Sequence, residues 1–199
     1  MKFCNQCGAP VRLLIPAGDN LPRHVCDACG TIHYENPRLV VGCVADHEGR
    51  ILLCRRAIEP RRGYWTVPAG FMENGETLQQ AAARESREEA LAEVTIGSLL
   101  SVVHVLHAQQ VHVFFRAALP AASYAAGAES LEVALLDPAD IPWADIAFLS
   151  TDFTLRRYLE DRAAGREPYH FTTLDRRLQP TGSPRNHASR SKTDAPQSR

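Results

Sequence analysis

The chain has 199 residues, of which 45% are hydrophobic and 23% are charged. This length accommodates one main domain and a small second one, and the composition is that of a folded globular protein, which excludes collagen-like, coiled-coil and wholly disordered chains. The formal net charge is -1, so no overall attraction to nucleic acid or to an anionic membrane is expected. An anionic substrate would have to be held by local groups.

The N-terminal sequence MKFCNQCGAP contains no apolar run of the kind that a secretory signal needs, so we expect a cytoplasmic protein. The longest stretch without a formal charge, residues 94–115, is long enough to cross a bilayer. However, it contains three histidines and two glutamines, which are costly in hydrocarbon. The stretch therefore predicts soluble strands, and no membrane partner is expected.

Four of the six cysteines form two C-x-x-C pairs, Cys4 with Cys7 and Cys26 with Cys29. Two such pairs supply four thiolates for a tetrahedral structural Zn²⁺, and a segment this short needs the metal in order to fold. A redox dithiol or unligated thiols are the alternatives. The sequence thus predicts a zinc ribbon over residues 1–36. Basic and acidic residues balance in this segment, unlike in a nucleic-acid reader, so we expect a packing or dimerisation module.

After Pro37, valine- and leucine-rich runs bounded by turn residues predict strands, and two longer segments predict helices. The first two strands, residues 39–45 and 51–54, flank the turn sequence DHEG and predict a hairpin. Further strands are expected near residues 65–68, 99–106, 111–117 and 131–136, and helices near 78–90 and 151–162. Strands and helices without regular alternation favour an α/β or α+β sandwich with a mixed sheet over residues 37–180. Residues 181–199 contain almost no large apolar residue and predict a disordered tail.

Most of the candidate catalytic residues lie in the stretch GFMENGETLQQAAARESREEALAE. A helix is expected to begin at Thr77, because Thr77 and Gln80 fit a capping box. In that helix Glu85, Glu88 and Glu89 share one face, where like charges repel unless a cation compensates them. Mg²⁺ (or Mn²⁺) binds carboxylate oxygens and commonly completes its coordination with substrate phosphate. The face therefore indicates a site for such a metal, with a solvated acidic surface as the alternative.

The wider spacing resembles the signature of the Nudix hydrolases, G-x5-E-x7-R-E-U-x-E-E-x-G-U, in which U is a bulky apolar residue. Two positions differ from it. Ser86 stands where the family has an apolar residue, and Leu91 replaces the glycine that caps the helix. The helix is therefore expected to end differently or to continue to about Glu93. Six fixed positions match the signature, and they are Gly70, Glu76, Arg84, Glu85, Glu88 and Glu89.

The resemblance implies a Nudix α/β/α sandwich that hydrolyses a nucleoside diphosphate linked to another moiety. It implies that Glu85, Glu88 and Glu89 bind Mg²⁺. It also implies that Arg84 and Glu76 brace the helix against the preceding loop. A metal is needed because a diphosphate repels the attacking water, and the cation neutralises its oxygens and lowers the pKa of the water.

In this family the general base comes either from the signature itself or from a later loop. Glu129 and Glu132 in the stretch AESLEVALL are the later carboxylates, and Glu132 is preferred as the base. Its alternative role is that of a solvent-facing strand residue.

A zinc ribbon before a Nudix domain is found in NADH pyrophosphatases and in a group similar to the plant FAD and ADP-ribose pyrophosphohydrolases. The S-Q-P-W-P-F-P-x-S stretch of the first group has no counterpart here, whereas IHYENPRLVVGC and GAESLE are similar to the second group. The resemblance favours FAD, followed by ADP-ribose. NADH hydrolysis and a nucleotide-sensing regulator without turnover are the alternatives, and a homodimer is expected by analogy.

Binding such dinucleotides requires stacking surfaces and phosphate clamps. Trp65 is a candidate ring partner, and Gly70 permits close backbone approach. Four arginines surround the first hairpin and either grip phosphate or form an exposed basic rim. They are Arg55, Arg56, Arg61 and Arg62, and Arg55 is the preferred phosphate ligand. The predicted substrate contacts are therefore Arg55, Trp65 and Gly70.

Overall fold

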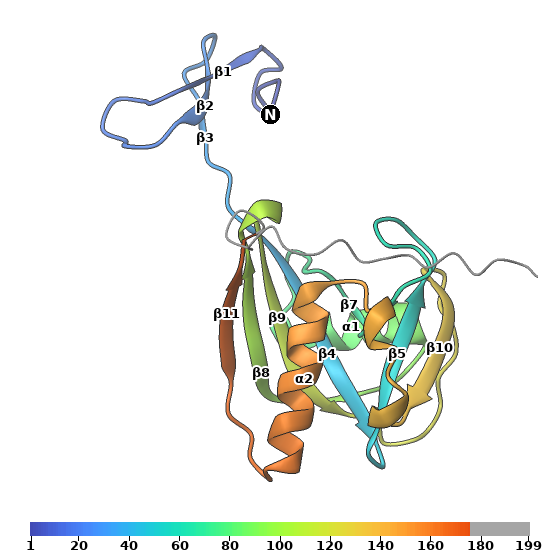
Figure 1. Cartoon of the computed structure of the whole chain (residues 1–199). Helices are drawn as coiled ribbons and strands as arrows, with labels where there is room; N and C mark the ends of the chain where they lie inside the picture. The colour runs from blue at the N-terminus through green and yellow to red at the C-terminus, as the bar shows by residue number, and fades with distance from the viewer. Residues whose placement is uncertain (176–199) are drawn as a thin grey trace, which may run out of the picture.

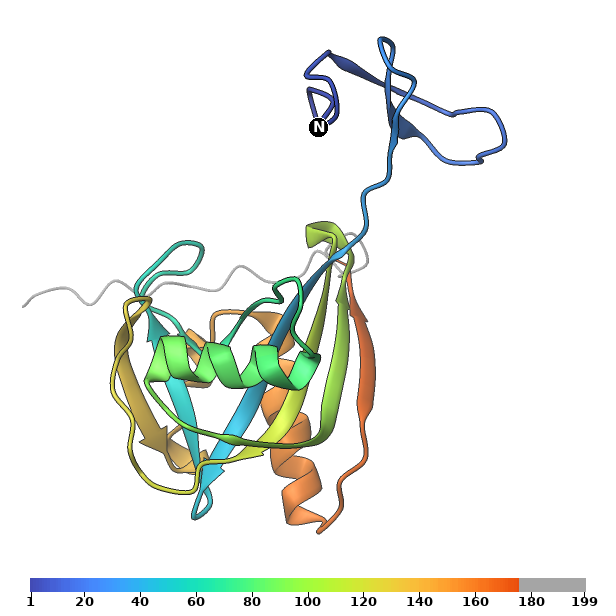
Figure 2. The same ribbon diagram turned by 180° about the vertical axis from the view of Figure 1, so that it is seen from behind.

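The computed structural model describes residues 1–175. A small N-terminal ribbon is joined by a short extended linker to a larger sandwich, and both views show the ribbon standing apart from it (Figures 1 and 2). The predicted disordered tail, residues 181–199, lies outside the described residues, as do the last five residues of the segment 37–180. Within residues 1–175, no helix combines the length and apolar composition needed to cross a bilayer.

The ribbon is an antiparallel sheet in the order β1-β2-β3, formed by β1 (Val11–Leu14), β2 (Arg23–Cys26) and β3 (Ile32–His33). Its large apolar side chains do not form a core, because Phe3, Leu13 and Ile15 are exposed. Cys4 and Cys26 are buried instead. Since a unit of this size cannot bury enough apolar surface to fold alone, the cysteine cluster is its interior.

The larger unit contains a mixed sheet in the order β10-β5-β4-β9-β8-β11, with β6 paired to β5 and β7 paired to β4. The pairs β4–β9 and β8–β11 are parallel, and the other pairs are antiparallel. This arrangement confirms the predicted mixed sheet. The strands are β4 (Arg38–His47), β5 (Arg50–Arg56), β6 (Trp65–Thr66), β7 (Ala69–Phe71), β8 (Thr95–Val105), β9 (Gln110–Ala118), β10 (Ser130–Leu136) and β11 (His170–Leu174).

One helix covers each face of this sheet, α1 (Leu78–Ala90) on one side and α2 (Leu149–Ala163) on the other (Figures 1 and 2). Successive side chains of a strand point to opposite faces, so Phe115 of β9 packs in the cluster on the α1 side and Phe114 in the cluster on the α2 side. Three short 3-10 helices complete the unit: η1 (Leu106–Ala108), η2 (Pro138–Asp140) and η3 (Trp143–Asp145). The α/β/α sandwich is therefore confirmed.

The helix α1 begins as the sequence predicts. The Thr77 hydroxyl accepts a hydrogen bond from the Gln80 N–H at 3.2 Å, and the Gln80 side chain accepts one from the Thr77 N–H at 2.8 Å. Ser86, which replaces an apolar residue of the signature, is fully buried. Its hydroxyl donates to the carbonyl of Ala82 at 2.9 Å and lies 3.2 Å from the Cys43 sulfur. The polar group is thus satisfied inside the helix layer.

The expectation that α1 continues to about Glu93 or ends differently without glycine is wrong. Leu91 itself adopts the left-handed conformation, with φ 46° and ψ 34°. Its N–H donates to the carbonyl of Arg87 at 3.1 Å, and the next N–H, of Ala92, donates to Ser86 at 3.3 Å, as in glycine-capped helix ends. Packing explains why the helix ends at this point, since the next residue, Ala92, is fully buried and the chain has to turn toward the core there.

Replacing Leu91 with glycine should therefore stabilise the protein by about 1 kcal/mol, because the left-handed conformation costs a residue with a Cβ roughly that much. The Leu91 side chain is 56% exposed, so little burial is lost. Urea unfolding followed by circular dichroism would measure the gain. Leu91→Ala is the matched control, since it keeps the Cβ and should give no comparable gain. Equal stability of the glycine and alanine variants would contradict the argument.

Candidate functional site

The loop between β7 and α1 is fixed to the helix by Arg84. Its Nε and Nη2 atoms donate to the two carboxylate oxygens of Glu76 at 3.0 and 2.8 Å, and Nη2 also donates to the carbonyl of Phe71 at 3.0 Å. The bonds from Arg84, together with the Glu73 N–H, lower the pKa of Glu76 to about 2. A bidentate arginine–carboxylate pair is geometrically specific. Arg84 and Glu76 thus lie where a brace between loop and helix requires them.

Three carboxylates line the same face of α1. Glu85 and Glu89 are buried, whereas the side chain of Glu88 is 58% exposed. Arg84 Nη1 donates to Glu85 at 2.7 Å and to Glu88 at 3.0 Å. Glu89 accepts a hydrogen bond from the backbone N–H of Ala69 at 3.1 Å. One arginine is therefore the counter-ion of two carboxylates, and the third has a backbone donor.

The electrostatics of this face fit a divalent cation. Burial raises the pKa of Glu89 to about 8, although the hydrogen bond from Ala69 opposes the shift. Burial also raises the pKa of Glu85, against the hydrogen bond from Arg84. Both shifts show that the neighbouring groups do not fully stabilise the ionised carboxylates. A hard cation would do so, and carboxylate oxygens are the ligands that Mg²⁺ prefers.

The carboxylates do not converge on one point. Among the described residues, the only group of three or more Cys, His, Asp or Glu ligand atoms within 4.8 Å of one another is the cysteine cluster of the ribbon. Mg²⁺ usually keeps several waters and uses one or two carboxylates together with substrate phosphate. Carboxylates spread along one helix face, two of them held by Arg84, are compatible with that mode of binding.

Two glycines let the surrounding backbone approach α1. A Cβ at Gly70 would overlap the carboxylate of Glu85, so the close approach predicted for Gly70 is made to Glu85. A Cβ at Gly127 would overlap the carbonyl of Glu88, and the Gly127 N–H donates to the carbonyl of Glu89 at 3.1 Å. The loop that precedes β10 is therefore anchored to the C-terminal half of the helix.

This anchoring brings Glu129, and not Glu132, to the acidic face. The negative charge of Glu129 contributes to raising the pKa values of Glu85 and Glu89. Glu132 lies opposite Arg55 in the β5–β10 pair, 3.5 Å from its guanidinium, with a side chain that is 53% exposed. The register shifts between Ser130 and Glu132, an irregularity that residue spacing does not show. Of the two later carboxylates, Glu129 is thus the one that acts on the acidic face, and the identity of the general base stays a prediction.

The structure places the other predicted substrate contacts as follows. Arg55 donates to the carbonyl of Gly63 at 3.0 Å and pairs with Glu132, away from the acidic face. Trp65 is half-buried, packs against the apolar cluster on the α2 side and forms a β-bridge with Ile146. The positive charge of Arg56 instead acts on Glu89.

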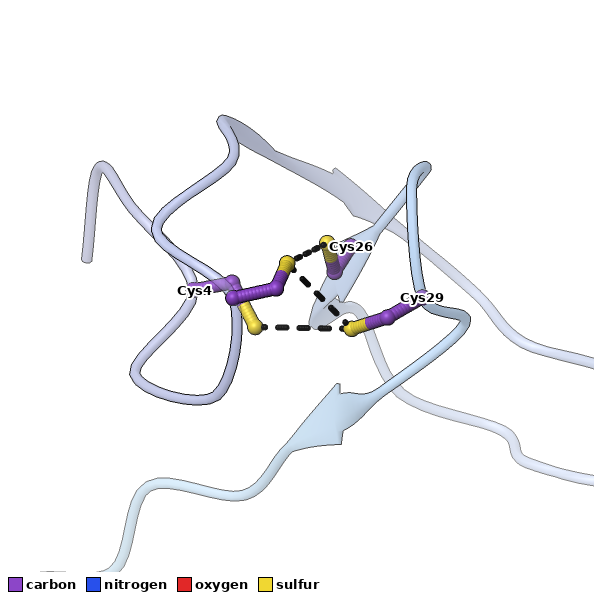
Figure 3. A group of neighbouring side chains, drawn as sticks. Cys4, Cys26 and Cys29 are labelled. Atoms are coloured by element: carbon purple, nitrogen blue, oxygen red, sulfur yellow. Dashed lines mark hydrogen bonds between the residues drawn. The ribbon is translucent and has the colours of Figure 1, made fainter.

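The four cysteines of the ribbon come together from two loops (Figure 3). The Cys4 and Cys29 sulfurs are 3.7 Å apart, and Cys7 lies 3.5 Å from both Cys26 and Cys29. In a tetrahedral site with Zn–S bonds of about 2.3 Å, the sulfurs are about 3.8 Å apart. His33 Nε2 lies 3.3 Å from the Cys4 sulfur, as a supporting group around a metal site would. The cluster fits a structural Zn²⁺.

Comparison with known families identifies both parts of the chain. The Nudix N-terminal zinc-ribbon model matches residues 2–35, and the NUDIX domain model matches residues 36–152. The NAD-capped RNA hydrolase NudC of Vibrio vulnificus is 41% identical over 97 residues, which are 48% of this chain and 34% of that protein. An ADP-ribose pyrophosphatase of Methanocaldococcus jannaschii is 36% identical over 69 residues, or 35% and 41% of the two chains. The chain thus matches about a third of the length of the NudC relatives.

Solved structures extend the similarity to nearly the whole described chain. A NUDIX hydrolase from Nitrosomonas europaea is 52% identical, with a TM-score of 0.85 over 87% of this chain and 99% of that one. An ADP-ribose pyrophosphatase from Streptococcus suis shares the fold at 19% identity, with a TM-score of 0.56 over 70% of this chain and 100% of the other. Because the NUDIX domain model covers more than half of the sequence, the chain belongs to the Nudix hydrolases and carries their N-terminal zinc ribbon.

Proposed function

We propose that this chain is a Mg²⁺-dependent pyrophosphohydrolase of nucleoside diphosphate-linked metabolites, with FAD and ADP-ribose as the first candidates. The observation that carries the proposal is the pair of buried carboxylates, Glu85 and Glu89, whose ionised forms the neighbouring groups do not fully stabilise. A bound Mg²⁺ would stabilise them and at the same time neutralise the diphosphate. Addition of water across the P–O–P bridge gives AMP with FMN from FAD, or AMP with ribose 5-phosphate from ADP-ribose.

Each group of the site has a defined task in this reaction. Glu85, Glu88 and Glu89 would hold the metal, which would polarise the phosphoryl oxygens and lower the pKa of the attacking water. Arg84 holds Glu85 and Glu88 in place and joins the helix to Glu76. Glu129, which is exposed and close enough to act on the cluster, accepts the proton of the water.

A second candidate is hydrolysis of NAD-type diphosphates. It is supported by the similarity to NudC proteins, whose name describes NAD-capped RNA as the substrate. The same carboxylates would serve this reaction, because it also breaks a P–O–P bridge, and the two candidates differ only in the group attached to the second phosphate. The absence of the S-Q-P-W-P-F-P-x-S stretch is the reason for placing FAD and ADP-ribose first.

The test is product identification with FAD, ADP-ribose, NADH and a nucleoside triphosphate, each with and without Mg²⁺. The proposal expects AMP from a dinucleotide only when Mg²⁺ is present, and loss of that product in Glu85→Gln. Release of pyrophosphate from the triphosphate alone would indicate a nucleoside triphosphatase. Nucleotide binding without any turnover would indicate a sensor. A homodimer also stays a prediction, to be checked by light scattering of the purified protein.

The proposal that Glu129, rather than Glu132, is the general base predicts a clear difference between two variants. Glu129→Gln should lower kcat by about 100-fold or more, because general base catalysis commonly contributes that much, while KM changes little. Glu132→Gln, the matched control on the same segment, should keep kcat within about threefold, since the Glu132 side chain is exposed and pairs with Arg55. Steady-state kinetics with the best substrate would measure both, and the reverse order would restore Glu132 as the base.

A further inference from the structure

The loop that precedes β10 covers the C-terminal end of α1. A helix leaves its last carbonyl groups without partners inside the helix. In α1 the carbonyl of Glu89 accepts a hydrogen bond from the Gly127 N–H at 3.1 Å, and the next carbonyl, of Ala90, accepts one from the Ala125 N–H at 2.9 Å. Tyr124, the residue before them, packs against the apolar cluster on the α1 side. This loop is therefore the cap of the helix that carries the acidic face.

Only glycine fits at position 127 of this cap. A Cβ there would overlap the carbonyl oxygen of Glu88 and would lie 2.9 Å from the carbonyl carbon of Glu88 and 3.2 Å from that of Glu89. These atoms belong to the main chain of a helix, so no rotation of a side chain relieves the overlap. The φ of Gly127 lies outside the left-handed region, so the glycine is required for space and not for conformation. Any other residue must therefore lift the loop from α1.

The same loop fixes the backbone of Glu129. The Ser130 N–H donates to the carbonyl of Gly127 at 3.1 Å, which closes a four-residue β-turn with Glu129 as its third residue. The carbonyl of Glu129 accepts a hydrogen bond from the Ala57 N–H at 2.8 Å, at the end of β5. The place of Glu129 relative to α1 thus depends on a turn whose first residue, Gly127, lies against the helix.

We propose that Gly127 is a positioning residue for the hydrolysis, and that its contact with the end of α1 sets where the Glu129 carboxylate stands relative to the carboxylates of the helix. The inference rests on the proposed function in taking Glu129 as the group that accepts the proton of the attacking water. A general base acts only within hydrogen-bond reach of the proton that it removes. A loop displaced by one methyl group moves the base out of that reach, while the carboxylates of α1 keep their places on the helix.

The experiment is a double-mutant cycle in kcat, measured at saturating Mg²⁺ with the best substrate. Gly127→Ala should lower kcat by about 10- to 100-fold, since a misplacement of about 1 Å can cost that much, and leave KM nearly unchanged. Adding Gly127→Ala to Glu129→Gln should lower kcat no further, because the displaced carboxylate is already removed. Adding it to Glu132→Gln should give its full loss. Gly97→Ala is the matched control, since a Cβ at Gly97 in β8 would meet no atom closer than 3.3 Å, and it should leave kcat unchanged.

Three results would overturn the inference while the proposed function stands. The first is a Gly127→Ala variant with the kcat of the wild type. The second is a double variant whose loss is the product of the losses of Gly127→Ala and Glu129→Gln, since Gly127 would then act through another group. The third is a Glu129→Gln variant that keeps its kcat, because Gly127 would have no base to position.

Hydrogen exchange tests the contact itself, independently of turnover. Gly127→Ala should lower the protection of the Ala125 and Ser130 amides, and unchanged protection would overturn the inference. If the wild type hydrolyses no dinucleotide, the proposed function fails, and the exchange result alone decides whether Gly127 holds the loop. If circular dichroism shows that Gly127→Ala is unfolded, Ala125→Pro decides by the same kinetic criteria, since it removes the N–H that binds Ala90 and keeps Gly127.

Discussion

Replacing Glu89 with glutamine is expected to lower Mg²⁺-dependent hydrolysis by more than about 100-fold and, at the same time, to stabilise the metal-free protein. The loss follows because groups that merely support metal ligands already cost 10- to 100-fold when removed, and Glu89 is proposed as a direct ligand. The gain follows because burial disfavours its charged form and raises its pKa to about 8. A neutral amide of the same shape avoids that cost and still accepts the N–H of Ala69.

Activity assays and thermal unfolding of the same preparations would check both halves of this result. A gain of about 1 kcal/mol corresponds to a Tm increase of roughly 2–4 °C for a chain of this size. Mg²⁺ should raise the Tm of the wild type, through binding to the folded state, and have less effect on Glu89→Gln. Glu93→Gln is the control, because Glu93 is exposed and pairs with Arg87 away from the cluster. A variant that keeps its activity, or loses it together with its fold, would refute the proposed role.

The parts of the fold that depend on local sequence were predictable. The capping box at Thr77 is a contact between residues three positions apart, and the C-x-x-C pairs specify a cluster by their own spacing. The six strands and two helices expected after Pro37 are all present, with shifted ends. In contrast, β7 and β11 were not predicted, because β7 has only three residues and β11, with the sequence HFTTL, contains only two large apolar residues.

The features that sequence spacing did not reveal have a common physical origin, which is tertiary packing. Leu91 takes a conformation that its side chain disfavours because buried neighbours fix the end of the helix. Glu129 reaches the acidic face because Gly127 packs on α1, a contact between segments about forty residues apart. Arg55 meets Glu132 because β5 pairs with β10. None of these contacts can be recognised from the spacing of neighbouring residues in the sequence.

Removal of zinc is expected to unfold the ribbon and to leave the Nudix domain folded and active. Residues 1–35 form their hydrogen bonds and ion pairs with one another, and the ribbon stands apart from the sandwich in both views (Figures 1 and 2). Structural zinc supplies on the order of 10 kcal/mol of folding free energy, which a segment with exposed apolar side chains cannot replace. Cys4→Ser should therefore abolish zinc content and hydrogen-exchange protection over residues 1–35, while the Tm of the remainder is unchanged.

A crossed control separates loss of zinc from loss of a thiol. Cys43 is buried in β4 and contacts Ser86, so Cys43→Ala should lower the Tm of the Nudix domain, because it leaves a small cavity, and keep the zinc content. If Cys4→Ser instead lowered kcat at saturating substrate, the ribbon would have to contact the site directly or through a second copy of the chain. Light scattering of Cys4→Ser distinguishes these cases. A lower molecular mass together with lost activity would show that the ribbon acts in assembly. Lost activity at an unchanged molecular mass would show that the ribbon contacts the site.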